Sequence, residues 1–123
     1  MVKETSLHTF KDVAVVFYYV VNEFKVLEMI NLLNAMEASS QNQKILKDQI
    51  VQYIEYIAVH FTGKALEFQR VTETPQEAFK NYLENEKEAF DEIRDSINLF
   101  ISKETKSIED ISITINQTMT YIL

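Results

Sequence analysis

The sequence has 123 residues, of which 46% are hydrophobic, so we expect one folded domain over residues 1–123 and not a disordered chain. A net charge of −7 argues against direct binding of nucleic acid or anionic lipid. One Gly, one Pro and no Cys exclude disulfides, thiolate metal sites and glycine-rich phosphate loops. The scarcity of turn residues also favours long helices over a sheet.

The stretch 13–21 is nine residues long and carries no charge. It belongs to a longer pattern of apolar residues at steps of three and four, made up of Phe10, Val13, Phe17, Val20, Phe24 and Leu27. This spacing predicts a helix over about 6–38, straight or bent in the middle. A strand over 13–21 is the alternative, because Val, Phe and Tyr favour sheets. The stretch is shorter than the roughly 20 apolar residues of a membrane span and no cleavage site follows it, so we expect neither a span nor a signal peptide.

A polar break at 37–42 separates this helix from a second one, predicted over about 43–70 with Ser40 as its cap. Its apolar side consists of Leu46, Ile50, Tyr53, Ile54, Ile57, Phe61, Ala65 and Phe68. Gly63 lies inside this helix, where Gly costs about 1 kcal/mol relative to Ala. We therefore expect the helix to bend or end at Gly63, or another backbone to approach it closely.

The segment Thr74-Pro75-Gln76-Glu77 predicts a helix start, because it combines a capping box with Pro at the first helical position. The predicted helix runs to about Lys103, with its apolar face formed by Phe79, Leu83, Phe90, Ile93, Ile97 and Phe100. Ser107 begins a last predicted helix. Its apolar residues are Ile108, Ile111, Ile115, Met119 and Ile122. A short strand over 111–115 is the alternative, since Ile alternates there with polar residues.

These elements together predict an all-α fold. We expect a single-domain bundle of about four helices, or five, packed mainly antiparallel.

No pattern in the sequence supports catalytic chemistry. Of the two histidines, His8 precedes the apolar pattern of the first helix, and His60 lies at the edge of the second helix's apolar stripe, where a single histidine is more often structural or solvent-facing than a haem ligand. No inward Glu-x-x-His pair suits a carboxylate-bridged metal site. Asn116 begins a glycosylation triplet that we interpret as chance without an export signal. We therefore predict no catalytic residue, no cofactor and no metal site, and we expect that the chain is not an enzyme.

Acidic side chains gather on one face of the third predicted helix, almost opposite its apolar stripe. The residues are Glu77, Glu84, Glu88, Asp91, Glu92 and Asp95. Like charges one turn apart repel slightly, so this row does not stabilise the isolated helix. The simple interpretation is a solvated outer face, and the alternative is a binding ridge for a basic partner.

Two further sets of residues are candidates for function. The first helix has more apolar surface than one seam needs, which suggests a homodimer or a stable protein partner, although a central helix buried on all sides explains it too. The candidate self-association or core residues are Phe17, Tyr18, Tyr19, Met29 and Met36. Asn31, Lys64 and Glu86 fall on apolar stripes, so they either form a buried polar cluster, line a ligand pocket, or extend their polar ends into water.

The function expected from these features is that of a small acidic cytoplasmic protein, non-enzymatic, which regulates or binds a protein partner or itself through its helical surfaces. The alternative is a globin-like or bundle-type sensor domain that binds an apolar small molecule such as a fatty acid in an internal cavity. Either function involves no direct contact with nucleic acid and no membrane span.

Overall fold

The structure is a computed structural model, and it describes residues 10–69, 73–102 and 107–122. These residues form six helices and no strand, which confirms the predicted all-α class. The helices are α1 (Phe10–Glu23), α2 (Val26–Asn34), α3 (Gln41–Phe68), α4 (Pro75–Asn85), α5 (Lys87–Ser102) and α6 (Ile108–Thr120). The number exceeds the predicted four or five because two of the predicted long helices are interrupted, one at Lys25 and the other at Glu86.

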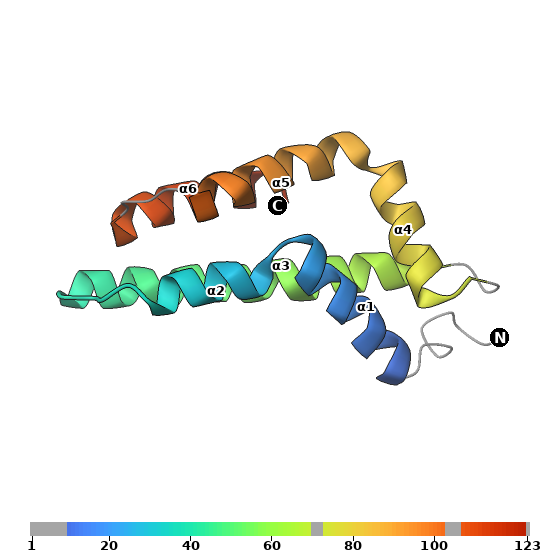
Figure 1. The fold of residues 1–123 in the computed structure, drawn as a ribbon, viewed down its shortest axis with the longest axis horizontal. Helices are drawn as coiled ribbons and strands as arrows, with labels where there is room; N and C mark the ends of the chain where they lie inside the picture. The colour runs from blue at the N-terminus through green and yellow to red at the C-terminus, as the bar shows by residue number, and fades with distance from the viewer. Residues whose placement is uncertain (1–9, 70–72, 103–106, 123) are drawn as a thin grey trace.

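The longest helix, α3, is the axis on which α1, α2, α4 and α6 pack (Figure 1). The helices α2 and α6 lie along its first half, and α1 and α4 pack against its second half. The helix α5, orange in Figure 1, contacts α2 and α6 and runs back over the half of the molecule that contains them. Among the described helices, none has both the length and the apolarity needed to cross a membrane.

Three of the predicted helix starts are confirmed by their caps. The Ser40 hydroxyl accepts the backbone N–H of Gln43 at 3.2 Å, and the Ser107 hydroxyl accepts that of Asp110 at 3.1 Å. Thr74 and Glu77 form the full capping box, each side chain accepting the backbone N–H of the other residue. Each cap satisfies donors that the first turn of a helix otherwise leaves unpaired.

The core is built from aromatic and branched side chains of all six helices. Phe24, Phe61 and Phe90 form its aromatic centre, with ring centroids 4.7 Å apart for Phe24 and Phe61 and 5.3 Å for Phe61 and Phe90. The predicted inward residues of the last helix, from Ile108 to Met119, are buried, while Ile113 is 59% exposed. This is helical spacing, so the strand alternative over 111–115 is wrong, as is the one over 13–21.

The predicted seam of the first helix is wrong in part. Val13, Phe17 and Leu27 are exposed, whereas Val16, Val20, Phe24, Met29 and Leu33 are buried. An apolar residue stands on nearly every side of this segment, so spacing alone does not identify the buried side. The packing of α1 against α3 and α4 decides it.

Candidate interaction surface

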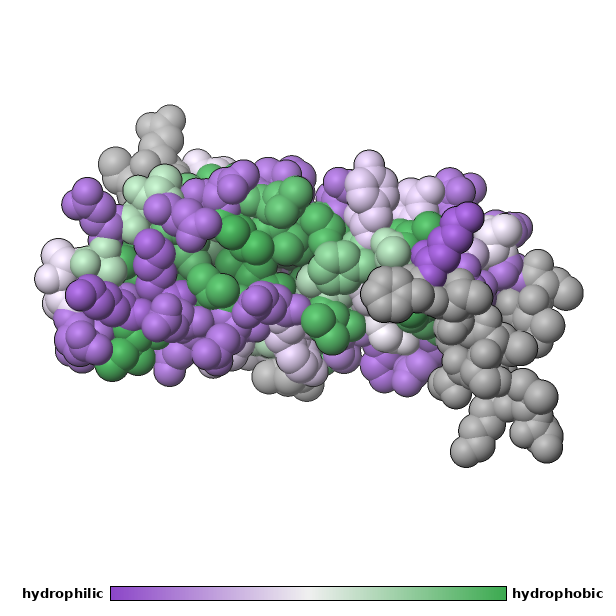
Figure 2. Space-filling view, turned by 90° about the horizontal axis from the view of Figure 1, so that it is seen from below, coloured by the Kyte–Doolittle hydropathy of each residue, from purple (hydrophilic) through white to green (hydrophobic). Residues whose placement is uncertain are grey.

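An apolar groove lies where α1, α2 and α3 meet, and its volume is about 500 Å³. The lining residues are Ala14, Phe17, Tyr18 and Val21 of α1, Val26, Leu27 and Ile30 of α2, and Glu55, Ala58 and Val59 of α3. Figure 2 views the molecule from below Figure 1 and shows a hydrophobic area near the middle of this face, between hydrophilic surfaces. Tyr18, Leu27 and Val59 are 63%, 56% and 66% exposed, although apolar side chains of this size are usually covered. The described part of the chain therefore leaves an apolar surface open to a partner.

The backbone at Lys25 creates the angle that opens this groove. Lys25 joins α1 to α2 with φ 51° and ψ 42°, and it is the one non-glycine residue with positive φ among those described. A left-handed residue ends one helix and turns the chain into the next without a loop. Ala58 of α3, which is buried, also lines the groove.

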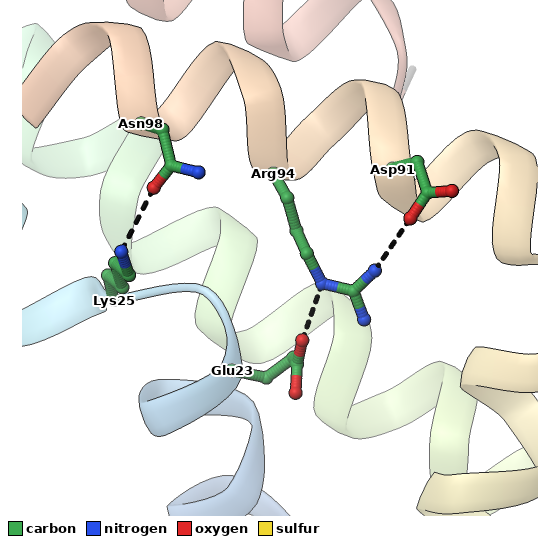
Figure 3. Close-up of polar contacts among 5 residues, drawn as sticks. All are labelled: Glu23, Lys25, Asp91, Arg94 and Asn98. Atoms are coloured by element: carbon green, nitrogen blue, oxygen red, sulfur yellow. Dashed lines mark hydrogen bonds and ion pairs between the residues drawn. The ribbon is translucent and has the colours of Figure 1, made fainter.

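Two polar contacts hold the bend at Lys25 against α5 (Figure 3). Lys25 Nζ donates a hydrogen bond to Asn98 Oδ1 at 3.0 Å. On the other side of the bend, Arg94 Nε donates to Glu23 Oε2, and Arg94 Nη1 donates to Asp91 Oδ1 at 3.2 Å. The helix α5 thus contacts both flanks of the bend, which fixes the angle between α1 and α2.

The structure divides the predicted self-association residues into two groups. Phe17 and Tyr18 line the groove and are exposed. Tyr19 and Met36 are partly buried against the core, with the Tyr19 ring stacked on Phe79 at 6.2 Å, and Met29 is fully buried. Phe17 and Tyr18 are therefore available to a partner, and self-association stays a prediction.

The predicted cluster of Asn31, Lys64 and Glu86 is not formed. All three residues are exposed. Lys64 instead forms an ion pair on its own helix, with Nζ 3.6 Å from Glu67 Oε2. Glu86 is not inside a helix, because it occupies the break between α4 and α5 with φ −113° and ψ 35°. Glu86 was predicted on an apolar stripe because residues 74–103 were treated as one continuous helix. The break changes the direction of α5 relative to α4, so that prediction does not apply to Glu86. The interpretation as a buried polar cluster or ligand pocket is wrong, and the polar ends extend into water.

The six predicted acidic residues are all exposed, but they do not form one row. The break at Glu86 separates the acids of α4 from those of α5. Glu77 acts in the capping box, where the backbone N–H of Thr74, followed by its hydroxyl, lowers the pKa of the Glu77 carboxyl. On α5, Asp91 accepts the bond from Arg94 described above.

Glu92 and Asp95, together with Leu99, line a second and more polar groove between α5 and α6, with a volume of about 450 Å³. Glu84 and Glu88 are also exposed. Binding of a basic partner by these acids stays a prediction.

His60 packs on its neighbours in α3. Its ring stacks on that of Tyr56, with the centroids 5.3 Å apart, and meets the ring of Phe61 edge-on, with the centroids 5.0 Å apart. Burial lowers the pKa of His60, and the charge of Lys64 lowers it further. The described residues contain no group of three or more His, Asp or Glu side chains placed to hold a metal ion.

Sequence reasoning missed Leu27 and Val59 as surface residues. Leu27 was assigned to the core seam, and Val59 stood outside every predicted stripe. Two features of the sequence point to the groove. The first predicted helix, which became α1 and α2, has a surplus of apolar residues, and the second, which became α3, carries Val59 on its polar side. The groove itself depends on the angle at Lys25.

Comparison with known proteins identifies a family. A family model described as "Glutamate dehydrogenase, C-terminal" matches residues 1–120, while no curated protein and no solved structure matches the chain. This match overturns the expectation of a non-enzymatic regulatory or interaction protein, that of a sensor domain, and the prediction that the chain is not an enzyme. The chain belongs to the glutamate dehydrogenase C-terminal family.

Proposed function

We propose that this chain is the helical C-terminal domain of a glutamate dehydrogenase, and that it supports the activity of that enzyme by binding the rest of it through the apolar groove of α1, α2 and α3. The observation that carries this proposal is the open groove, in which Tyr18, Leu27 and Val59 are each more than half exposed. Domains that fold as parts of one enzyme cover such surfaces against each other.

The composition of the chain indicates that the dinucleotide site of the enzyme lies outside it. The dinucleotide-binding turn typical of dehydrogenases uses several glycines at fixed spacing, and this sequence has one glycine. We therefore assign the dinucleotide site to another part of the enzyme and the supporting contact to this chain. A chain without cysteine requires no oxidising compartment, so the cytoplasm is the proposed location.

Covering the groove contributes favourable free energy to a contact with the rest of the enzyme. Complete burial of a Val or Leu side chain contributes about 1.5–3 kcal/mol. Since more than half of Leu27 and Val59 is exposed, covering these two side chains alone contributes about 2–4 kcal/mol. Phe17 and Tyr18 add to this because they line the same groove.

The test uses two purified components. One is this chain, and the other is a glutamate dehydrogenase of the same organism prepared without the region that corresponds to it. Binding is measured by isothermal titration calorimetry, and activity by the initial rate of glutamate-dependent dinucleotide reduction. We expect the chain to bind and to raise the activity of the shortened enzyme.

Leu27→Asp is the informative variant, and Leu99→Asp is its matched control. Leu99 is 48% exposed, similar to Leu27, but it lies on α5 away from the apolar groove. A carboxylate in the covered groove should raise the Kd at least about tenfold, whereas the control should leave it unchanged. Far-ultraviolet circular dichroism checks that both variants keep their helix content. Failure of the wild-type chain to bind, or equal binding by both variants, would overturn the proposal.

A further inference from the structure

We propose that the groove is occupied by a single amphipathic helix from the rest of the glutamate dehydrogenase, and that this helix places a Lys or Arg side chain against Glu55. This inference rests on the proposed function and specifies the partner of the same groove. Three observations carry it: the apolar lining, the spacing of the lining residues, and the isolated charge of Glu55.

The lining favours a helix over an extended segment. The groove is formed by side chains of three helices, and nine of its ten lining residues are Ala, Val, Leu, Ile, Phe or Tyr. An extended segment in this groove would bury backbone N–H and C=O groups without partners, because the described residues offer no strand edge to pair with it. A helix satisfies its own backbone groups and presents only side chains.

The spacing of the lining residues sets the length of contact. The residues of α1 in the lining are Ala14, Phe17, Tyr18 and Val21, which follow the i, i+3, i+4, i+7 pattern of one helix face. They extend over two turns, or about 10 Å along the axis. A helical occupant that contacts the groove over this length presents apolar residues at i, i+3, i+4 and i+7 over about two turns.

The charge of the lining distinguishes the rest of the enzyme from a second copy of this chain. Glu55 is the one lining residue with a charge at neutral pH, it is exposed, and it makes no ion pair with any residue that the structure describes. Two copies meeting groove to groove would bring no Lys or Arg from the lining to Glu55, and each copy carries a net charge of −7. A helix with a basic residue beside its apolar stripe complements this surface.

The experiment uses the two-component complex described above. A photoreactive benzophenone amino acid replaces Val59, the complex is irradiated, and the linked residues are identified by mass spectrometry. The same substitution at Leu99 is the control. We expect links from position 59 to one segment of the enzyme, at residues spaced by three or four, next to a Lys or Arg.

Charge reversal then tests the contact with Glu55. Glu55→Lys should raise the Kd about fivefold, the scale of one exposed ion pair replaced by repulsion. Glu37→Lys changes the net charge equally at an exposed position between α2 and α3, outside the lining of the groove, and should have no effect. Replacing the identified basic residue of the enzyme with Glu should restore the binding of the Glu55→Lys chain.

The outcomes separate this inference from the proposed function. If the wild-type chain binds the enzyme and Leu27→Asp does not, the proposed function stands. Links from position 59 to alternating residues or to a second copy of this chain would then overturn the helical occupant. A small apolar molecule retained in native mass spectra in place of a linked segment, or no rescue by charge reversal, would also overturn it. If the wild-type chain does not bind the enzyme, both proposals fail.

Discussion

Exchanging Gly and Ala should change the stability of this chain in opposite directions at positions 25 and 63. Position 63 lies inside α3, and a Cβ added to Gly63 meets nothing within 4 Å. Position 25 has φ 51°, where the Cβ of an L residue is crowded by the backbone. The local backbone, and not the residue type, should therefore decide which of the two variants is more stable.

The magnitudes follow from these two backbone conformations. In a helix interior Gly is less stable than Ala by about 0.5–1 kcal/mol, so Gly63→Ala should raise the free energy of unfolding by that amount. In the left-handed region an L residue costs about 1–2 kcal/mol, which exceeds the extra conformational entropy that Gly loses on folding. The variant Lys25→Gly should then be more stable than Lys25→Ala by about 0.5–1 kcal/mol. Both variants at position 25 lose the bond to Asn98, so their difference does not contain it.

Urea unfolding followed by far-ultraviolet circular dichroism measures these differences, provided that the transitions are two-state with equal slopes. Lys25→Ala being as stable as Lys25→Gly would refute a left-handed bend between α1 and α2. A loss of stability in Gly63→Ala would mean that the space around Gly63 is occupied.

Three other substitutions test the caps and the core. Thr74→Ala should lower the free energy of unfolding by about 1 kcal/mol, because it removes the cap of α4; a change near zero would contradict the capping box. Glu77→Gln tests pH dependence, because the pKa of Glu77 is lowered from 4.5 in the folded chain. The ionised carboxylate therefore stabilises the fold above pH 4.5, and this stabilisation is lost as the pH falls through the pKa of the folded state. The difference in unfolding free energy between wild type and Glu77→Gln should therefore shrink below pH 4.5, and a constant difference would count against this cause. Phe90→Ala should cost about 3–5 kcal/mol in the same urea experiment, because the Phe90 ring packs against Phe24, Phe61 and Tyr82, and a loss well below that range would place the ring outside the core.

The comparison between prediction and structure shows where local signals are sufficient. Ser40, Thr74 and Ser107 were identified as helix starts because a cap depends on residues three apart, which the sequence displays directly. The inward residues of α5 and α6 followed from period alone, since apolar and polar residues are largely separated on these helices. Most of the buried residues of α3 also match its predicted stripe, although α3 exposes Val59 on its other side.

Local signals were insufficient where the tertiary structure overrides them. Neither Lys25 nor Glu86 is a helix breaker, and the interruptions at these residues accompany packing against other helices. The break at Glu86 was not predicted, and the predicted cluster of Asn31, Lys64 and Glu86 was therefore wrong as well. A break changes the direction in which the side chains at and beyond it point. The enzyme family was not predicted, because the chain carries no catalytic motif that points to it.

The sequence by itself determined that the chain is all-helical, where several helices begin, and that the first helix carries surplus apolar surface. These properties depend on composition, caps and period, which act over a few residues. The tertiary structure decided which of those apolar residues stay open, because the left-handed bend at Lys25 and the packing of α1 and α2 against α3 form the groove. A groove between three helices depends on contacts between segments far apart in the chain, and residue order alone does not specify their angles.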